Sequence, residues 1–520
     1  MKSPDSSPSG SATSDVARAL HRWGLPPALL QELSAVTDET TALYLRLNEL
    51  AADELSERRS TVARRRAVRE VNGSDSAKAW MYRTSDPGDI TRVGSLKGQR
   101  LAVKDCIQVT GVPMTLGTDF FRHLPTSDAP AVSRALASGA SLAGTTVCEA
   151  LCLSGSSFTS ATGAVPNPFD PERSAGGSSS GSAVVVALGE ADIALGTDLG
   201  GSVRNPASWC GVTGLKPTFG VIPYTGAMAT EASMDHIGLI ARRAQQIEPF
   251  LVALAGPDGV DHRQVSALPL RPLTEDPRLR IGLVSEGFGH ALADPRVDDA
   301  VRSAAHALGS LHHPRGVMDI SIPLHTHAPD IHAPIAGEGA LITLFERSLQ
   351  DSNDLAFYDD DLAENFAAAI RERPADLPLN AVATLVATST ARMRNDGTVI
   401  AKAQRMRRAL RAQYNNALTQ HDLLIMPTVP MLPHRLPRVP LSMQEHRRLA
   451  FEMHDNNCAT NLTGHPSITI PCAVIDGMPV GLLLIGRHFE DRQLIAAAAQ
   501  FQENCFEPPI PQELPRGRLQ

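Results

Sequence analysis

Apolar residues follow a helical period in the first part of this chain and form short, glycine-bounded runs in the rest. Val16, Leu20 and Trp23 fall on one face of a helix, and a second apolar-periodic run covers residues 43–50. A Gly-Leu-Pro-Pro sequence separates these two runs and breaks the helix between them. This pattern predicts a small all-helical domain over residues 14–75.

From about residue 86 onwards, short apolar runs alternate with stretches of helical period. Such runs and stretches cover residues 100–103, 131–138, 141–144, 182–188, 192–195, 279–284, 297–311, 467–470 and 480–485. Strands that alternate with helices are typical of an α/β protein built on a sheet. We therefore expect one large α/β domain over residues 76–510.

The segment over residues 325–440 has a different pattern of apolar residues from the rest of this domain. Up to about residue 420 it is mostly of helical period, and residues 423–426 then predict a strand. Pro427 to Pro440 predicts an irregular loop, because each proline fixes φ and removes a backbone donor. The α/β pattern resumes after this loop, and a last helix is expected from about Asp491.

Composition and charge narrow the class of protein. The formal net charge is −8 and no basic stripe stands out, so we expect no nucleic-acid partner. No apolar run reaches the length that spans a bilayer, so we expect no membrane partner either. Residues 1–13 are rich in Ser, Pro and Gly, which predicts a disordered tail and no secretory signal. Seven cysteines without a Cys-x-x-Cys pair predict reduced thiols in a cytoplasmic protein.

Two serines in glycine-rich surroundings are the strongest candidates for chemistry. Ser178 lies within Ser-Ala-Gly-Gly-Ser-Ser-Ser-Gly-Ser over residues 174–182, and Ser202 follows Gly200 and Gly201. Small residues before Ser202 let several backbone N–H groups converge on one point, as an oxyanion hole requires. A lone Gly-Gly-Ser is usually a plain turn, and a Gly/Ser run is often a flexible linker. Here structured apolar sequence flanks the run on both sides, which favours a role in a site.

Lys104 ends an apolar, strand-like run and is the third candidate for chemistry, beside Ser178 and Ser202. A lysine at such a place commonly reaches out to solvent. If it is buried instead, desolvation lowers its pKa, and a neutral lysine can act as a general base. We expect Lys104 to draw a proton through Ser178 from Ser202, which makes a nucleophilic hydrolase that needs neither a histidine nor a cofactor.

Four other interpretations concern the run around Ser178, two of the cysteines and the histidines. The run around Ser178 also matches the Gly-x-Ser-x-Gly elbow of α/β-hydrolases, although Gly/Ser runs match that pattern by chance. It lacks the Gly-Lys-Ser/Thr of a phosphate-binding loop. Cys148 and Cys152 are spaced for adjacent helical turns and predict a buried, inert pair. The histidines at 312–313 and 325–332 lack the spacing of metal ligands, so we expect no metal.

The stretch from Gly176 to Pro223, with Gly-Leu-Lys-Pro-Thr-Phe-Gly at residues 214–220, resembles the signature of the amidase signature family. Lys104, residues 463–467 and residues 477–481 extend the resemblance over about residues 95–500. Within the family the chain is similar to bacterial amidases of nitrile metabolism. This implies the amidase-signature fold, a mixed central β-sheet covered by helices on both faces, with a small all-α N-terminal domain that mediates a homodimer.

The resemblance also implies a Ser-cisSer-Lys triad. In it, Ser202 is the acylated nucleophile, Ser178 is the bridging serine after a cis peptide bond, and Lys104 is the base. The implied oxyanion hole consists of the backbone N–H groups of Leu199, Gly200, Gly201 and Ser202. The residues implied to support the site are Ser179, Thr197 and Arg204, whereas Lys216 is structural. Substrate contacts are expected from Ser154, Gly155, Phe158 and Tyr224, with core packing as the alternative for Phe158, Tyr224, Trp209 and Phe345.

The function that this resemblance implies is hydrolysis of a small carboxamide through an acyl-enzyme, without a cofactor. The same triad could cleave carbamates, esters or anilides, or form amides by acyl transfer. Membership of a tRNA-dependent amidotransferase complex is a further alternative. Ser180 stands where the family commonly has glycine, and the segment 325–440, expected over the substrate pocket, matches the family least. The acyl group of the substrate is therefore not specified by the sequence.

Overall fold

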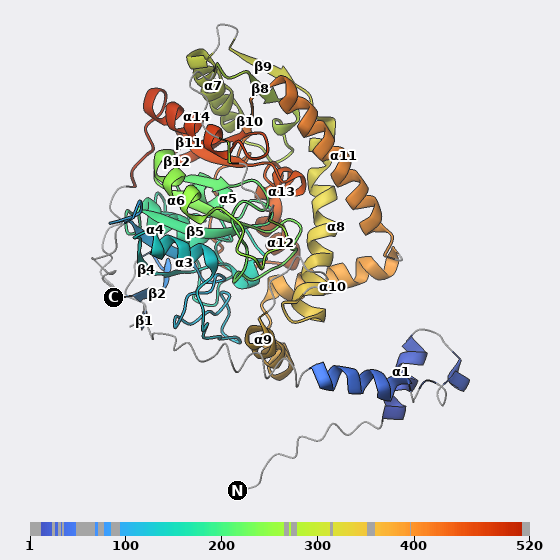
Figure 1. The fold of residues 1–520 in the computed structure, drawn as a ribbon. Coiled ribbons are helices and arrows are strands. Elements are labelled where there is room, and N and C mark those ends of the chain that lie inside the picture. Colours follow the sequence, from blue (N-terminus) through green and yellow to red (C-terminus); the bar gives the residue numbers. More distant parts are fainter. Residues whose placement is uncertain are drawn as a thin grey trace. The chain divides into compact units, whose positions relative to one another are not determined.

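A mixed β-sheet with helices on both of its faces is the framework of the protein (Figure 1). The computed structural model describes residues 12–22, 26–29, 33, 36–47, 68–70, 77–84, 94–264, 270–271, 278–312, 316–350, 359–395 and 397–511. The chain divides into two compact units, Met1–Arg64 and Arg65–Gln520, and the sheet belongs to the second.

Within the described residues, twelve strands form this one sheet in the order β1-β2-β4-β3-β5-β7-β6-β11-β12-β10-β8-β9. The strands are β1 (Val68–Glu70), β2 (Trp80–Thr84), β3 (Arg100–Lys104), β4 (Ser141–Thr146), β5 (Ile193–Asp198), β6 (Thr213–Lys216), β7 (His236–Ala241), β8 (Ile281–Val284), β9 (Val317–Ile320), β10 (Leu423–Pro427), β11 (Ser467–Ile475) and β12 (Met478–Ile485). β3 runs parallel to both β4 and β5, whereas β5 and β7 are antiparallel. Parallel β3 and β5 therefore end at the same edge of the sheet.

The α-helices of the larger unit connect and cover these strands. They are α3 (Pro130–Ala137), α4 (Ser180–Ala187), α5 (Arg204–Trp209), α6 (Ile247–Leu254), α7 (Pro295–His312), α8 (Ala328–Ala340), α9 (Asp360–Glu372), α10 (Leu379–Arg394), α11 (Val399–Gln420), α12 (Met443–Phe451), α13 (Cys458–Thr463) and α14 (Asp491–Asn504). Single turns complete the set at η2 (Ala150–Cys152), η3 (Ala244–Gln246), η4 (Ser285–Gly287), η5 (Pro323–His327), η7 (Pro374–Asp376) and η8 (Glu452–His454), and a π-helical stretch, η6 (Leu341–Glu346), continues α8.

Successive residues of the central strands enter different cores, because side chains alternate across a sheet. In β3, Leu101 and Val103 belong to the core beneath α3, α6 and α14, whereas Ala102 belongs to the core beneath α4. A third buried cluster joins β10 and β12 to α8, α11 and α13. The sheet is thus covered on both faces, which confirms the predicted mixed α/β architecture.

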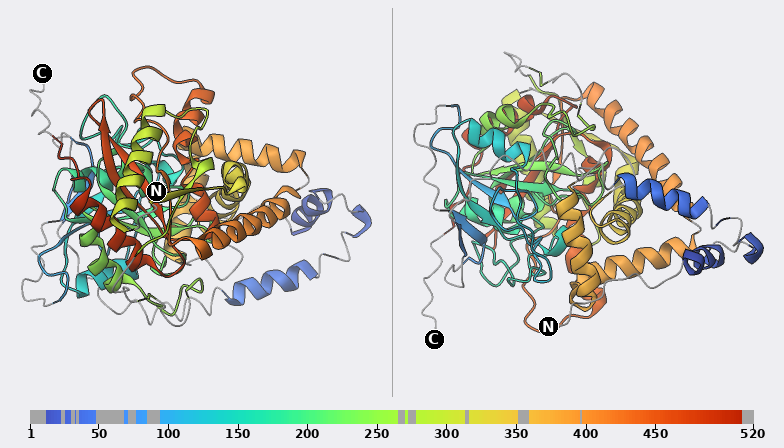
Figure 2. Two further views of the ribbon diagram at one scale, coloured as in Figure 1. Left: turned by 90° about the horizontal axis from the view of Figure 1, so that it is seen from above. Right: turned by 60° about the horizontal axis from the view of Figure 1, so that its bottom comes forward.

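Helix α8 of the segment 325–440 contacts three other α-helices, two from the same segment and one from beyond it. α8 contacts α10, α11 and α13 (Figure 2). Ile331 and Ile335 of α8 and Leu410 and Tyr414 of α11 share one buried cluster. This segment therefore forms a helical layer, as its period predicts, and residues 423–426 form a strand of the main sheet.

Most of the predicted elements of the larger unit are present, and the differences have physical causes. β6 and β7 were missed because every residue in them is buried, so that neither shows an apolar–polar alternation. The helical prediction for residues 14–75 is wrong at its end. Residues 68–70 form β1, which pairs with β2 and belongs to the larger unit.

In the smaller unit, the described residues include two longer helical stretches and a single turn, η1 (Pro27–Leu29). α1 (Ala12–Arg22) buries Val16 and Leu20, as their spacing predicts. Residues 36–47 are helical too, but Leu43, Leu45 and Leu47 are exposed. Residues 1–11, Trp23 and Leu50 lie outside the described residues.

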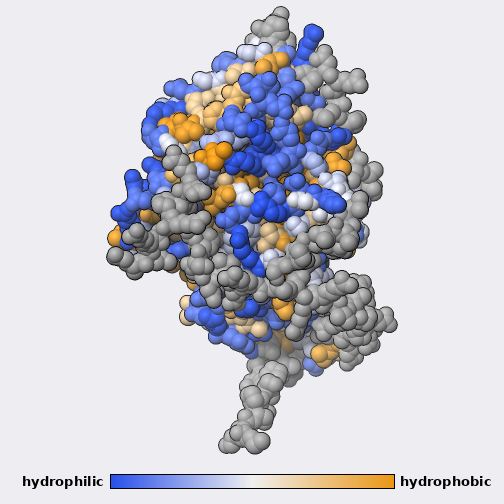
Figure 3. Space-filling view, turned by 90° about the vertical axis from the view of Figure 1, so that its left-hand side faces the viewer, coloured by the Kyte–Doolittle hydropathy of each residue, from blue (hydrophilic) through white to orange (hydrophobic). Residues whose placement is uncertain are grey.

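One face of the larger unit shows how polar and apolar residues are distributed on its surface. The face in Figure 3 is mainly hydrophilic, with hydrophobic residues scattered over it, as is normal for a folded domain. Among the described residues, we find no helix with both the length and the apolar character needed to cross a bilayer.

Candidate active site

Lys104 and Ser178 meet at the edge of the sheet where β3 and β5 end. Lys104, the last residue of β3, is fully buried, and its Nζ lies 2.8 Å from Ser178 Oγ. Its second partner is Thr197 Oγ1 on β5, also at 2.8 Å. The parallel pairing of β3 and β5 brings Lys104 and Thr197 together, and the segment that precedes α4 contributes Ser178. The structure thus places the predicted lysine, bridging serine and supporting threonine in one hydrogen-bonded group.

The backbone around Ser178 leaves no room for larger residues. Gly177 and Ser178 are joined by a cis peptide bond, as the family resemblance implies. A Cβ on Gly177 would lie 2.9 Å from Glu149 Cγ. Gly176 has a φ of 78°, a left-handed conformation that favours glycine. α4 begins directly after, at Ser180, so that Ser178 is held between a tight turn and a helix.

Ser202 lies in the turn that follows β5 and leads into α5. Its backbone oxygen accepts a hydrogen bond from the N–H of Ser179 at 3.1 Å, which ties this turn to the Ser178 segment. Within the described part of the chain, no hydrogen bond joins the hydroxyls of Ser178 and Ser202 directly. Hydrogen bonds between catalytic groups are often long without substrate, so this geometry is compatible with the predicted relay.

The turn over residues 198–203 presents several backbone donors. The N–H groups of Leu199, Gly200 and Ser202 have no hydrogen-bond partner among the described residues. The N–H of Gly201, the fourth expected oxyanion donor, is instead bonded to Asp198 Oδ1 at 2.8 Å. Three donors therefore remain for a ligand in this structure.

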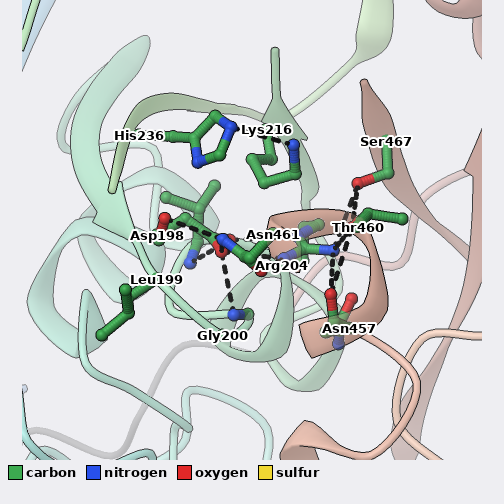
Figure 4. Close-up of polar contacts among 12 residues, drawn as sticks. Asp198, Leu199, Gly200, Arg204, Lys216, His236, Asn457, Thr460, Asn461 and Ser467 are labelled. Atoms are coloured by element: carbon green, nitrogen blue, oxygen red, sulfur yellow. Dashed lines mark hydrogen bonds and ion pairs between the residues drawn. The ribbon is translucent and has the colours of Figure 1, made fainter. Parts of the chain in front are cut away.

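A buried ion pair holds the turn in place (Figure 4). Arg204 Nη2 lies 2.8 Å from Asp198 Oδ1, and both side chains are fully buried. The same carboxylate accepts the N–H groups of Gly201 and Val203. The guanidinium of Arg204 also donates to four residues far along the chain, which are Asn457, Thr460, Asn461 and Ser467. Arg204 thus holds the turn that carries Ser202, and its partner Asp198 was not among the predicted residues.

Charge and burial act in opposite directions on this network. Burial alone would raise the pKa of Asp198, but the charge and hydrogen bonds of Arg204 hold that pKa far below its usual value. Burial and the Arg204 charge together lower the pKa of Lys216. Lys216 Nζ lies 2.7 Å from the backbone oxygen of His465 and 3.3 Å from His236 Nε2. These contacts agree with a structural role for Lys216.

Three thiols border Lys104 and alter the expectation for its pKa. Burial disfavours the ammonium form, but the thiols of Cys152, Cys106 and Cys148 favour it, and the net effect raises the pKa of Lys104. Hydrogen bonds with Cys106 and Cys148 and the charge of Lys104 lower the pKa of Cys152 in turn. The prediction that burial leaves Lys104 with a lowered pKa is therefore wrong.

The expected pair of helical, inert cysteines is also corrected. Cys152 lies in the short turn η2, where Leu151 and Cys152 both have a positive φ, and Cys148 precedes that turn. Cys152 interacts with Lys104, so it is not an isolated structural thiol. Four-residue spacing alone suggested a helix, and the left-handed turn could not be deduced from it.

The four residues expected to contact substrate have different surroundings. Ser154 is buried and lies 2.6 Å from Ser156 Oγ, and the N–H of Gly155 donates to Ala450. Phe158 packs edge-on against the rings of His434 and His446.

Two aromatic candidates lie in the core. The hydroxyl of Tyr224 donates to the backbone oxygen of Met228, and Arg263 lies over its ring. Trp209 is buried and donates through Nε1 to the backbone oxygen of Met431. The contacts of both side chains are therefore those of core packing, the alternative weighed for them.

Two histidines beside the turn were not predicted at all. His332 of α8 and His454 of η8 lie within hydrogen-bond distance of the backbone oxygens of Leu199 and Gly200, respectively. They are 133 and 254 positions away from these partners in sequence. No motif surrounds them, so nothing in the sequence connects them with Ser202.

A family model described as Amidase matches residues 67–495 of this chain. The chain is 35% identical over 505 residues to an enantioselective amidase of Rhodococcus rhodochrous, covering 94% of this chain and 95% of that protein. It is also 31% identical to a glutamyl-tRNA(Gln) amidotransferase subunit of Methanosarcina mazei, over 88% of this chain and 95% of that protein. The family match begins at β1 and includes all the predicted triad residues.

Solved structures show the same fold. The structure of 6-aminohexanoate cyclic dimer hydrolase with its substrate superposes with a TM-score of 0.68 at 26% identity, covering 81% of this chain and 88% of that one. A structure described as an amidase superposes with a TM-score of 0.64 at 28% identity, covering 79% and 86% of the two chains. These likenesses confirm the fold class that the sequence predicts for the larger unit.

Proposed function

The chain belongs to the amidase family and is an amidase, and we propose that it hydrolyses a small carboxamide to a carboxylic acid and ammonia or an amine. In this proposal Ser202 carries the acyl group, Ser178 bridges, and Lys104 is the base. The observation that carries it is the 2.8 Å contact between Lys104 Nζ and Ser178 Oγ in a buried setting. Burying an amine is costly, and whereas the Nζ of Lys216 contacts backbone oxygens, that of Lys104 contacts the hydroxyls of Ser178 and Thr197, which favours a chemical role.

Acylation requires two linked proton transfers. The proton of the Ser202 hydroxyl passes to Ser178 Oγ while the Ser178 proton passes to Lys104 Nζ. Ser202 Oγ then forms a bond with the amide carbon, and the carbonyl oxygen takes up the negative charge. We propose that the N–H groups of Leu199, Gly200 and Ser202 stabilise this charge, since they are the free donors of the turn.

Collapse of the tetrahedral intermediate reverses the relay. The proton held by Lys104 returns through Ser178 to the leaving nitrogen, the C–N bond breaks, and ammonia or an amine departs. Water then attacks the acyl-enzyme, loses its proton along the same route, and releases the carboxylic acid with Ser202 restored. All of these steps use side chains and backbone groups of the chain itself.

The raised pKa of Lys104 sets the pH range of this chemistry. Only the neutral amine accepts a proton, and the neighbouring thiols favour the ammonium form. The proposed amidase activity therefore rises with pH from neutral into the alkaline range. Thr197 Oγ1, the second neighbour of Nζ, helps to hold the amine in line with Ser178.

A second candidate function is a role within an amidotransferase, which the likeness to the Methanosarcina mazei protein favours. Such a role needs partner chains, whereas the proposed amidase acts alone or as the homodimer that the helical N-terminal stretch suggests. Light scattering of the purified chain gives its own oligomeric state. Amide turnover by that purified species separates the two candidates.

The experiment is the release of ammonia or amine from a panel of aliphatic amides, aryl amides, anilides and carbamates. Ser202→Ala is the control, because it removes only the proposed nucleophile. Release by the wild type and not by the control supports the proposal and ranks the acyl groups. If the wild type releases nothing from any compound, the chain is not a self-sufficient amidase.

A further inference from the structure

The turn that carries Ser202 is anchored through its carbonyl groups, one peptide after another. Four backbone oxygens each have a nitrogen within hydrogen-bond distance, which are Asp198 with Asn461 Nδ2 at 2.9 Å, Leu199 with His332 Nε2 at 3.1 Å, Gly200 with His454 Nδ1 at 2.8 Å, and Gly201 with the N–H of Asn205 at 2.7 Å. His454 Nδ1 also lies 2.8 Å from Asn205 Nδ2, so its role toward Gly200 depends on its tautomer. The four nitrogens come from α13, α8, η8 and α5. Four separate elements thus converge on the outer side of one turn.

Each of these contacts also sets the direction of an N–H group. In a trans peptide the C=O and the N–H of the same planar unit point in opposite directions. The peptides of this turn are trans, because the cis bond of the described residues is at Gly177–Ser178. A donor on the Leu199 carbonyl therefore aims the N–H of Gly200 away from that donor. The same relationship links the Gly200 carbonyl to the N–H of Gly201.

The two histidines differ in what they control. The peptide between Gly200 and Gly201 is held on its N–H by Asp198, whatever the tautomer of His454, whose Nδ1 lies near both the Gly200 oxygen and Asn205 Nδ2. The preceding peptide, between Leu199 and Gly200, is held only on its oxygen, by His332. Among the described residues, His332 is thus the one hydrogen-bonding partner that orients the free N–H of Gly200.

The chemical state of His332 follows from its partner. A carbonyl oxygen only accepts hydrogen bonds, so Nε2 carries the proton and donates. Burial lowers the pKa of His332 to about 4, so the ring is neutral at neutral pH. The ring also packs against Gly200, where a Cβ would lie 3.2 Å from its Cε1 and Nε2. Glycine at this position lets the imidazole reach the carbonyl.

α8 holds the ring rigidly. Ile331 and Ile335 flank His332 in sequence and are buried in the cluster formed with Leu410 and Tyr414 of α11. This core therefore fixes the position of the α8 backbone from which His332 reaches the turn. α8 belongs to the helical segment 325–440, so this contact joins that segment to the turn that carries Ser202.

We propose that His332 is a positioning residue, which aims the N–H of Gly200 at the oxyanion through its hydrogen bond to the Leu199 carbonyl. This inference rests on the proposed function, because it assumes that Ser202 is the nucleophile. The hydrogen bond to the carbonyl also polarises the peptide and strengthens its N–H as a donor. His332 touches no reacting atom and acts only through the backbone.

A fluorophosphonate probe tests this role without an amide substrate. Ser202 Oγ forms a bond to phosphorus, the P–F bond breaks, fluoride departs, and the serine proton enters the relay. The phosphoryl oxygen occupies the oxyanion hole during this step, so the labelling rate reports on its donors. Intact mass and peptide mapping measure the rate and confirm the labelled residue.

Three variants separate a hydrogen-bonding role from a packing role. His332→Leu removes the donor, and His332→Gln retains an N–H at nearly the same place. His488→Leu is the matched control, because His488 Nε2 also bonds a backbone oxygen, that of Thr463, at 3.1 Å, and its pKa is also lowered to about 4. Thermal unfolding of all three variants measures how much stability is lost when such a hydrogen bond is removed.

We expect His332→Leu to label about 10- to 100-fold more slowly than the wild type, because a misdirected N–H of Gly200 no longer stabilises the transition state. His332→Gln and His488→Leu should label within a few fold of the wild type. On any amide that the wild type turns over, His332→Leu should lower kcat with little change in KM.

Two outcomes overturn the inference while leaving the proposed function intact. In one, His332→Leu labels at the wild-type rate. In the other, His332→Gln is as slow as His332→Leu, which means that the ring is needed for its shape. Failure of the wild type to be labelled at Ser202 would instead refute the nucleophile, and with it the proposed function.

Discussion

Arg204 and Asp198 form an ion pair that is fully closed to solvent, at 2.8 Å, directly behind the turn that carries Ser202. Asp198 accepts the N–H groups of Gly201 and Val203, so the pair fixes the backbone of the turn as well as its own charges. The side chain of Asn461 donates to the same carboxylate. The position of the nucleophile therefore depends on contacts with α13, far along the chain.

Breaking this pair should be costly for stability. Arg204→Met leaves the Asp198 carboxylate buried without its partner, and we expect a loss of about 3–5 kcal/mol in the free energy of unfolding. Arg100→Met is the control, because the Arg100–Asp192 pair also links β3 to the start of β5 but has an arginine that is 46% exposed. That change should cost less than about 1 kcal/mol. Denaturant unfolding measures both changes. If the two variants lose the same free energy of unfolding, the buried Arg204–Asp198 pair is no more important for stability than the exposed one.

The thiol of Cys152 should control the pH profile of the enzyme. Because Cys152 favours the ammonium form of Lys104, Cys152→Ala lowers the pKa of that lysine. A base works in its deprotonated form, so the rise of kcat/KM with pH should move to lower pH in this variant. Cys505→Ala, which changes a thiol outside the cluster, should leave the profile in place. A rise that stays where it was in Cys152→Ala would show that the thiol does not act on Lys104.

Removing the base should suppress turnover while leaving the fold intact. Lys104→Met keeps the volume of the buried chain but cannot accept a proton from Ser178. We expect kcat to fall by about 100- to 10,000-fold, the usual contribution of a general base. Lys97→Met, at an exposed lysine that precedes β3, serves as the control and should be fully active. Turnover by Lys104→Met close to that of the wild type would rule out the base assignment.

Ser180 offers a test of packing next to the relay. Its hydroxyl is buried and has no hydrogen-bond partner among the described residues. The family resemblance implies glycine at this position, which has no hydroxyl to satisfy. Ser180→Ala should therefore raise the free energy of unfolding by up to about 1 kcal/mol, since an unsatisfied polar group is removed.

The neighbouring Ser182 provides the opposite case on the same helix. Its Oγ lies 2.7 Å from Thr146 Oγ1 and donates to Leu195, so Ser182→Ala should cost about 1 kcal/mol. Chemical denaturation measures the free energy of unfolding of both variants, and we expect it to rise in Ser180→Ala and to fall in Ser182→Ala. Destabilisation of similar size in both would mean that the Ser180 hydroxyl has a partner in solution.

The larger part of the fold could be predicted because local patterns specify it. The apolar run of β3 and the glycine-bounded run of β5 were both recognised, and so was the resemblance around Ser178 and Ser202. Once Lys104 was assigned to the end of a strand, its contact with Thr197 needed only the parallel pairing of β3 and β5. Its contact with Ser178 also needed the turn before α4, which is tied to Ser202 by the N–H of Ser179. Strands β6 and β7 were missed because full burial removes the alternation that marks a strand.

The environment of the site could not be predicted in the same way. The effect of Cys152 on the pKa of Lys104 depends on a left-handed turn at Leu151, and the residue types there do not predict such a turn. His332 reaches Leu199 only because α8 packs on α11 and α13, a tertiary arrangement without a sequence motif. The pKa of Lys104 went in the unexpected direction for this reason, since burial was foreseen and the thiols were not.

The most direct test of the account is to trap the acyl group. The enzyme is mixed with an amide that it turns over, quenched in acid within the first turnover, digested and examined by tandem mass spectrometry. The account predicts an added mass equal to the acyl group on Ser202, and none in Ser202→Ala. An acyl group found on Ser178 or Cys152, or turnover that persists in Ser202→Ala, would contradict it.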